Sequence, residues 1–117
     1  MAKAKLIVLE LPNRPGAAAG ATAVLSDAGV NIQSIFGWGP DGVVQLVVDN
    51  PRKAAKALAG AGVTYSEANA ETAELPNKPG ALNGHLAKLA KKGVNVRSII
   101  ATTTKAGRKA VVVWTTD

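Results

Sequence analysis

An internal repeat at an offset of 64 residues is the feature that most constrains how this chain can fold. Residues 10–16 read Glu-Leu-Pro-Asn-Arg-Pro-Gly, and residues 74–80 read Glu-Leu-Pro-Asn-Lys-Pro-Gly. From residue 10 to residue 36, 15 of the 27 positions are identical to their counterparts. Chance does not produce this level of identity, so the chain is two copies of one unit. We place these units at residues 1–66 and 67–117.

Each repeated turn is expected to lead directly into a helix. Pro15 and Pro79 suit the first helical position, where the missing N–H costs nothing. Gly29 and Gly93 suit the left-handed residue that ends a helix. In the second unit, Leu82, Leu86 and Leu89 recur at helical spacing and predict one apolar stripe, with His85 beside it as a packing residue. The first helix has a weaker apolar stripe, which consists of Ala21, Leu25 and Ala28.

Two strands follow each helix and are predicted to form a hairpin. The first hairpin turn, Gly39-Pro40-Asp41-Gly42, supplies Pro where φ is fixed and Gly where φ is positive. Asn50-Pro51 then begins a second helix, with Ala54, Ala55 and Leu58 on its inner side. The expected strands cover residues 5–11, 30–38, 43–49, 70–75, 94–103 and 108–115.

This element order predicts an α+β fold of two ferredoxin-like βαββαβ units in tandem, each with an antiparallel sheet. The second unit is expected to lack its last helix and strand. Residues 63–75 can extend over about 40 Å at ~3.3 Å per residue, which is enough to end one sheet and begin the next. Units of about 55 residues are marginal alone, and both third strands are almost continuously apolar. We therefore expect a homodimer or higher homo-oligomer.

Composition excludes several classes of function. The 117 residues contain no Cys and one His, so disulfides, thiolate sites and His-rich metal sites are excluded, and no metal or cofactor is expected. No apolar run could span a bilayer and no signal peptide is visible, so we expect a cytoplasmic protein with no membrane partner. No Ser, Glu or Lys constellation has an identifiable base, so we expect no enzyme and no catalytic residues.

The repeated turns and the Gly-Val-Asn motifs after the helices are the candidate binding elements. A helix N-terminus offers unpaired N–H groups and the positive end of the helix dipole, which favour a carboxylate. Gly16 and Gly80 permit a ligand to approach this backbone closely. Side-chain amides can both accept from an ammonium and donate to a carboxylate, and they can equally shape turns. The amides concerned belong to Asn13, Asn31, Asn77 and Asn95.

With its Pro-Asn-Arg-Pro-Gly turn, helix and Gly-Val-Asn-Ile strand start, each unit resembles the ACT domain, here in tandem over nearly the whole chain. The resemblance implies a ferredoxin-like regulatory module that binds a small ligand, usually an amino acid, at ACT–ACT interfaces. It also implies control of an enzyme or pathway of amino-acid metabolism. On this basis the chain is expected to be a non-catalytic, allosteric sensor or regulatory protein that acts on a separate enzyme.

The resemblance also assigns residues. In serine-sensing members of the family, the turn Asn and the Asn of the Gly-Val-Asn-Ile motif hold the ligand, which carries over to Asn13, Asn31, Asn77 and Asn95. The backbone at Pro15-Gly16 and Pro79-Gly80 is expected to contribute. Those members also place a His two residues before the turn Asn, where this chain has Leu11 and Leu75. This departure argues against serine as the ligand.

Nucleic-acid binding is the alternative function. The net charge of +6 suits an anionic partner, and ferredoxin-like sheets can stack bases on exposed aromatic side chains. Phe36 and Trp38 share a strand face, but we expect them to pack in a core or an interface. The chain also lacks the Lys/Arg-Gly-Phe-Gly-Phe type of strand signature, so the small-ligand function is favoured.

Overall fold

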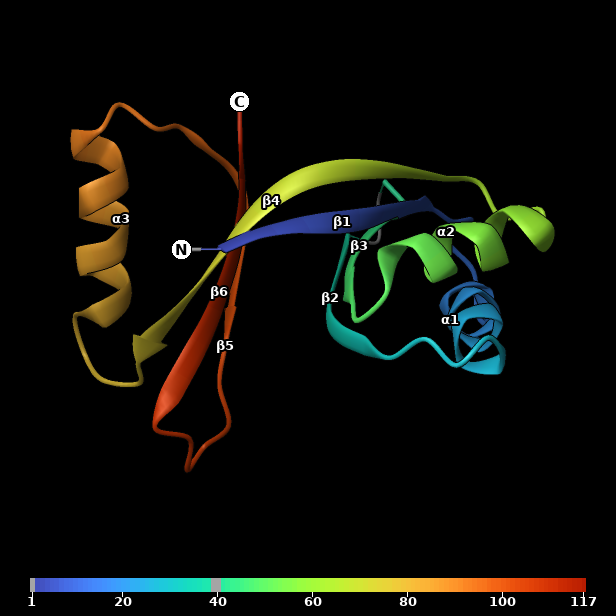
Figure 1. Ribbon diagram of the computed structural model, residues 1–117, viewed down its shortest axis with the longest axis horizontal. Helices are drawn as coiled ribbons and strands as arrows, with labels where there is room; N and C mark the ends of the chain where they lie inside the picture. Colours follow the sequence, from blue (N-terminus) through green and yellow to red (C-terminus); the bar gives the residue numbers. More distant parts are fainter. Residues whose placement is uncertain (1, 39–40) are drawn as a thin grey trace. The chain divides into compact units, whose positions relative to one another are not determined.

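The computed structural model describes residues 2–38 and 41–117, and the chain divides into two compact units (Figure 1). The N-terminal unit is Lys5–Ala68, and the C-terminal unit combines residues 2–4 with Asn69–Asp117. Both β1 and β4 run from one unit into the other, so β4 belongs to both units, as the length of residues 63–75 predicts, but the strands form one six-stranded sheet rather than the two expected. The elements are β1 (Ala2–Glu10), α1 (Ala17–Asp27), β2 (Ile32–Trp38), β3 (Val43–Val48), α2 (Pro51–Gly60), β4 (Tyr65–Pro76), α3 (Ala81–Lys91), β5 (Val96–Thr102) and β6 (Lys109–Thr116).

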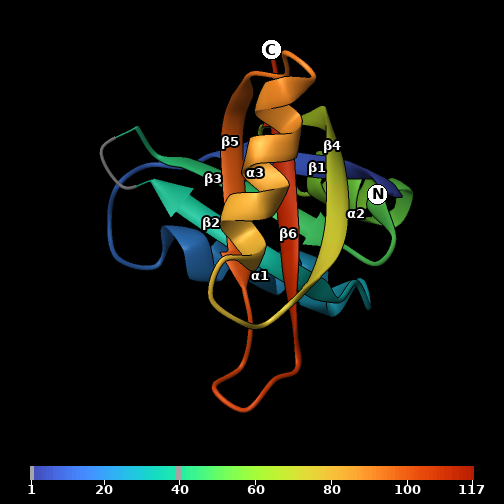
Figure 2. The ribbon, with the colours of Figure 1, turned by 90° about the vertical axis from the view of Figure 1, so that its left-hand side faces the viewer.

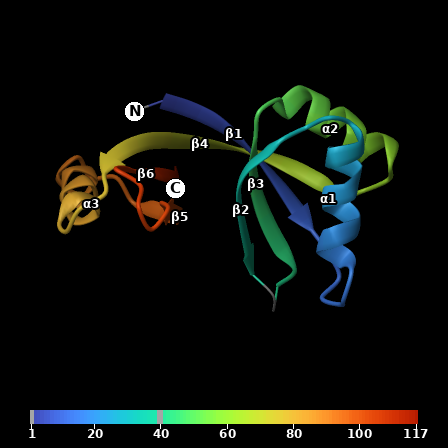
Figure 3. The same ribbon diagram turned by 90° about the horizontal axis from the view of Figure 1, so that it is seen from below.

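The N-terminal unit has the ferredoxin-like strand order β2-β3-β1-β4. Strands β1 and β3 are antiparallel, with Ile7 opposite Leu46, and β3 pairs antiparallel with β2. Figure 3 shows α1 and α2 together on one side of this sheet. Of the predicted hairpin turn, Gly39 and Pro40 lie outside the described residues.

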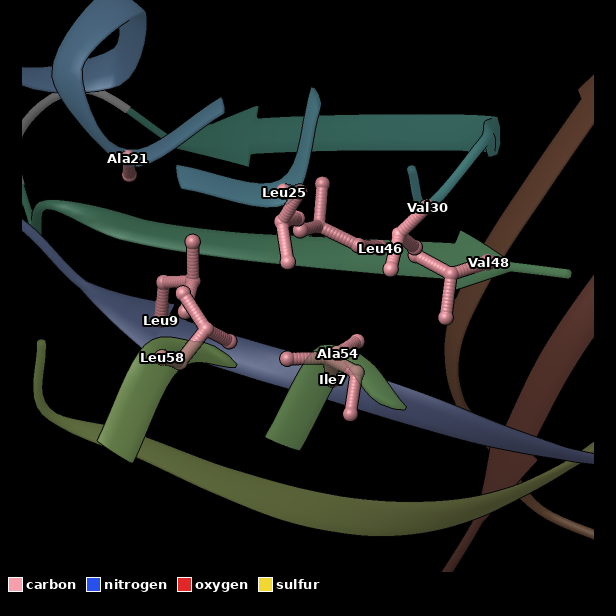
Figure 4. Packing of buried hydrophobic residues seen from close by; sticks show 9 residues of the cluster. All are labelled: Ile7, Leu9, Ala21, Leu25, Val30, Leu46, Val48, Ala54 and Leu58. Atoms are coloured by element: carbon pink, nitrogen blue, oxygen red, sulfur yellow. The ribbon is translucent and has the colours of Figure 1, made fainter. Parts of the chain in front are cut away.

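The core of the N-terminal unit lies between this sheet and its two helices (Figure 4). Helix α2 begins as predicted, because the Asn50 side chain accepts a hydrogen bond from the Lys53 N–H at 3.1 Å. Burying each large aliphatic side chain stabilises the fold by roughly 1.5–3 kcal/mol. The buried cluster consists of Ile7 and Leu9 from β1, Ala21 and Leu25 from α1, Val30 between α1 and β2, Leu46 and Val48 from β3, and Ala54 and Leu58 from α2.

The C-terminal unit has the same strand order, β1-β4-β6-β5, with residues 2–4 of β1 in the outer position. The Thr72 hydroxyl donates to the Ala2 carbonyl at 3.5 Å across this pairing. The C-terminal unit therefore has a fourth strand, although the sequence predicts that this unit lacks its last strand. Within the described part of this unit, α3 is the one helix, and it covers β5 and β6 (Figure 2).

A large aromatic side chain fills the core of the C-terminal unit. Trp114 lies opposite Glu71, which corresponds to the pairing of Leu46 with Ile7 in the other unit. Only 1% of Trp114 is exposed, and its ring meets His85 of α3 edge-on at 4.5 Å between ring centroids. An indole in place of a leucine compensates for the apolar surface that a second helix supplies in the N-terminal unit.

The predicted apolar stripe of α3 is wrong at its N-terminal end. Leu89 is buried, but Leu82 is 39% exposed, and His85 occupies the inward position instead. The reason is geometric, because His85 lies one turn before Leu89 and faces Trp114. His85 therefore packs in the core, as predicted.

The two helices that follow the repeated turns begin later than the prolines predict. Gly16 and Gly80 are the N-caps, with φ of 87° and 88°. A residue with positive φ cannot belong to a right-handed helix, so Pro15 and Pro79 lie outside the helices rather than at their first position. Gly29 and Gly93 have φ of 76° and 74° after the helices, as predicted. No helix in the described residues is long and apolar enough to cross a membrane.

Candidate functional site

The repeated turn of the N-terminal unit forms one wall of a pocket of about 170 Å³. The start of α1 forms a second wall, and the adjoining ends of β2 and β3 complete it. Arg14 adds a positive charge, whereas most of the other side chains are apolar. The lining residues are Leu11, Pro12, Asn13, Arg14, Ala17, Ala18, Gly37, Trp38, Gly42 and Val44.

A close backbone contact brings the β2–β3 hairpin to this turn. The Leu11 N–H donates to the Gly42 carbonyl at 2.7 Å. Gly42 has φ of +65°, and a Cβ atom at this position would lie 2.1 Å from the Leu11 carbonyl oxygen. Only glycine allows the hairpin to approach this closely. The Asn13 side chain is exposed next to this contact, and it has no hydrogen-bond partner among residues 2–38 and 41–117.

The C-terminal unit has a matching pocket of about 210 Å³ at its own repeated turn. Here the asparagine is used internally, because the Asn77 Nδ2 donates to the Gly107 carbonyl at 2.7 Å and the Asn77 N–H donates to the Arg108 carbonyl at 2.9 Å. Lys78 supplies the positive charge in this pocket, as Arg14 does in the pocket of the N-terminal unit. The lining residues are Leu75, Pro76, Asn77, Lys78, Ala81, Leu82, Ala101, Thr102, Thr103, Ala110 and Val112.

Both pockets adjoin a helix start that no side chain caps. The N-caps Gly16 and Gly80 make no side-chain hydrogen bond, and a Cβ atom at either position would meet nothing within 4 Å. The first N–H groups of a helix lack intrahelical partners and lie at the positive end of its dipole. With Arg14 or Lys78 beside them, these ends can receive a carboxylate, and the apolar walls can receive an aliphatic group.

Of the predicted site residues, Asn13 and Asn77 line the two pockets, whereas Asn31 and Asn95 do not. Asn31 follows the C-terminal end of α1, and an 11-residue helix is about 16 Å long, so Asn13 and Asn31 lie near opposite ends of it. The Asn31 N–H donates to Asp49 Oδ1 at 3.0 Å. The Asn95 side chain donates to the Asp117 carboxylate. Each of these asparagines thus joins the start of one strand to the end of its neighbour.

Trp38 is a pocket residue that sequence reasoning missed. Trp38 stacks on Phe36 at 6.4 Å between ring centroids. Trp38 is 56% exposed and Phe36 is 38% exposed, so neither side chain packs in the core of this unit, and their packing in an interface stays a prediction. Ile35 pairs with the buried Leu46 and shares its face of the sheet, so Phe36 and Trp38 lie on the opposite face. The order of the elements could have placed Trp38 there, because β2 runs back along α1 and therefore ends beside the repeated turn.

In the described part of the chain, no group of three or more His, Asp or Glu side chains is placed to hold a metal ion. The titratable side chains of the pockets are the cations Arg14 and Lys78. These groups can bind and orient an anion. The described lining residues include no carboxylate or imidazole that could act as a general base.

Comparison with known proteins gives the family of the N-terminal unit. The sequence profile of the ACT domain matches residues 5–62, so this unit contains an ACT domain. No curated protein sequence matches the chain. Among solved structures, a Bacteroides thetaiotaomicron protein is 27% identical with a TM-score of 0.82, and the match covers 98% of this chain and 78% of that one.

Two further structures share the fold at lower identity. The ligand-free regulatory subunit of aspartate kinase from Thermus thermophilus has a TM-score of 0.71 at 17% identity, covering 97% of this chain and 83% of that one. A structure of aspartokinase alpha and beta subunits has a TM-score of 0.68 at 17% identity, and the match covers 96% of this chain and 81% of that one. The fold described above is therefore shared with these aspartate kinase subunits.

Proposed function

We propose that this chain is a tandem ACT-type regulatory protein that binds a small ligand, an amino acid, at its repeated turns and performs no chemistry itself. The observation that carries the proposal is the pair of matching pockets, each formed by a Pro-Asn-basic turn against an uncapped helix start. The ACT domain at residues 5–62 supports a ligand-binding role for the first of them. A separate enzyme of amino-acid metabolism is the expected target of the regulation.

Pocket size and lining favour an aliphatic amino acid. Volumes of about 170 and 210 Å³ are small beside the roughly 300–1,000 Å³ typical of pockets for larger ligands. The ligand carboxylate would lie at the helix start beside Arg14 or Lys78. Its side chain would contact the apolar wall, which contains Leu11 and Val44 in one pocket and Leu75 and Val112 in the other. The leucines stand where the serine-sensing relatives are expected to have histidine.

The positions of the asparagines favour a site completed by a second unit. Asn13 and Asn31 lie near opposite ends of α1, so a small ligand that contacts both needs residues from two ACT-type units. The same reasoning applies to Asn77 and Asn95 at α3. This supports binding at an ACT–ACT interface in a homodimer or higher homo-oligomer, with Pro15-Gly16 and Pro79-Gly80 contributing backbone.

Nucleic-acid binding is less well supported. The exposed pair Phe36 and Trp38 belongs to the N-terminal unit, in which five Lys and Arg residues balance five Asp and Glu residues. Binding to single strands combines aromatic stacking with a positively charged groove. The N-terminal unit offers the aromatic rings without the net charge.

A thermal-shift screen against the twenty amino acids tests the proposal. We expect valine, leucine or isoleucine to raise the melting temperature in a concentration-dependent manner, because a ligand that binds only the folded state stabilises it by mass action. Serine and aspartate serve as controls with polar side chains, and we expect smaller shifts from them. If no amino acid shifts the transition at millimolar concentration, the proposed ligand class is wrong.

A further inference from the structure

The net positive charge of the chain resides entirely in the C-terminal unit. This unit has nine Lys and Arg residues against three Asp and Glu residues, whereas the N-terminal unit has five of each. The net charge of +6 is therefore +6 on one unit and zero on the other. Two copies of one duplicated unit have acquired very different electrostatic surfaces.

Part of this charge forms a compact cluster at the C-terminal end of α3. We call Lys88, Lys91 and Lys92 the α3 lysine cluster. All three side chains are exposed, and residues three and four apart in a helix lie on the same side. Among the described residues, none of the three forms an ion pair, whereas Lys109 is 3.8 Å from Glu74 elsewhere in the unit.

Comparison with α1 shows that the fold does not require these lysines. The positions 64 residues earlier are Val24, Asp27 and Ala28, although the two helices share their glycine N-caps and the leucine at the inner position. Cations in the last turn favour the helix dipole. However, α1 and α2 have no basic residue in their last turns, so the other helices of this chain form without that contribution.

We propose that the α3 lysine cluster is a docking surface for an acidic segment of a partner protein. A non-catalytic regulator must act on another protein, so the inference extends the proposed function, although it uses none of the pocket residues. Opposite charges across an interface steer association and select the partner. Lysine, a compact point charge on a flexible stem, suits carboxylates presented on a mobile acidic segment.

The C-terminal unit lacks the other features of a nucleic-acid surface. Its one aromatic residue, Trp114, is buried, so no ring is available to stack on a base. The cluster contains no arginine, the residue that recognises phosphate in a bidentate geometry. An acidic protein segment is therefore the occupant that the charge and the composition favour.

Binding of a short poly-L-glutamate peptide to the full chain tests this proposal, with a single-stranded RNA of equal charge as the competing probe. The test variant is Lys88→Gln, Lys91→Gln, Lys92→Gln. The matched control is Arg52→Gln, Lys53→Gln, Lys56→Gln on α2, which removes the same amount of charge from the N-terminal unit. Binding is measured at low and at physiological ionic strength, because exposed charge pairs are screened by salt.

We expect the α3 variant to bind poly-L-glutamate about tenfold more weakly than the wild type, since each exposed ion pair contributes a few-fold. The α2 variant should change affinity less than threefold. Equal losses of affinity in both variants would overturn the proposal, because they would show that binding depends only on the net charge of the chain. Tighter binding of the RNA than of the peptide would overturn it in favour of a nucleic-acid partner. Both variants should keep the wild-type response to amino acids, so a failure here is distinguishable from a failure of the ligand proposal.

Discussion

The two repeated turns have nearly the same sequence, but they use their asparagines differently. In the C-terminal unit, the Asn77 amide donates to the Gly107 carbonyl and holds the turn against the β5–β6 hairpin. In the N-terminal unit, the corresponding turn is held by backbone contact with Gly42, and the Asn13 amide has no partner in the described part of the chain. One asparagine is therefore committed to structure, whereas the other is available to a ligand.

This difference shows that identical residues at repeated positions do not imply identical roles. The role depends on the segment that packs against the turn, and the two hairpins have different sequences. The N-terminal hairpin places Gly42 against Leu11, and the C-terminal hairpin places Gly107 against Asn77. The cores differ in the same way, because two helices cover the strands of the N-terminal unit, whereas one helix and a buried tryptophan form the core of the C-terminal unit. The following experiments test these differences.

The largest effect is expected from the core of the C-terminal unit. Trp114→Ala should lower the free energy of unfolding by about 3–5 kcal/mol, because it removes the largest buried side chain and its contact with His85. Denaturant titration measures this loss. Trp114→Phe is the control, and it should recover more than half of the stability. A loss below about 1 kcal/mol for the alanine variant would show that this indole does not replace the second helix.

The next largest effect compares the glycines that bring each hairpin to its turn. Gly42→Ala should cost more than about 2 kcal/mol, because it adds a positive-φ penalty to a clash with the Leu11 backbone. Gly107→Ala should cost less, since the atoms that its Cβ meets at 2.7 Å are threonine hydroxyls that can rotate away. Thermal or denaturant unfolding ranks the two variants. A reversed order would contradict the account of the close turn contact.

The asparagines themselves are expected to show smaller changes in stability. Asn77→Ala should cost about 1 kcal/mol through loss of its hydrogen bond to Gly107, whereas Asn13→Ala should stay within about 0.5 kcal/mol. With an amino-acid ligand, Asn13→Ala should still weaken binding. Ligand-free denaturation and ligand titration of both variants separate the two roles. Equal stability losses would mean that Asn13 also shapes its turn.

Much of the fold could be predicted from the sequence. The repeat located both turns, Gly29 and Gly93 marked the helix ends, and the length of residues 63–75 predicted a strand that belongs to both units. Residues 2–4 at the edge of the C-terminal sheet could not be predicted, because strand pairing between distant segments leaves no local pattern.

The candidate site was predictable only in part. The repeated asparagines directed attention to the turns, and both turns do line pockets. The distance between Asn13 and Asn31 and the contribution of Trp38 depend on how the hairpin folds back along α1. Neither this distance nor the position of Trp38 can be predicted from the spacing of residues in the sequence. The different partners of Asn13 and Asn77 depend on hairpin geometry in the same way.

Backbone amide chemical shifts during titration with isoleucine, leucine and valine test the central claim most directly. The account predicts saturable shifts at the two turns and helix starts, residues 11–19 and 75–83, for at least one of these amino acids. In Asn13→Ala the shifts at residues 11–19 should require higher ligand concentrations. Saturable shifts confined to other residues, or none up to millimolar concentration, would contradict ligand binding at the repeated turns.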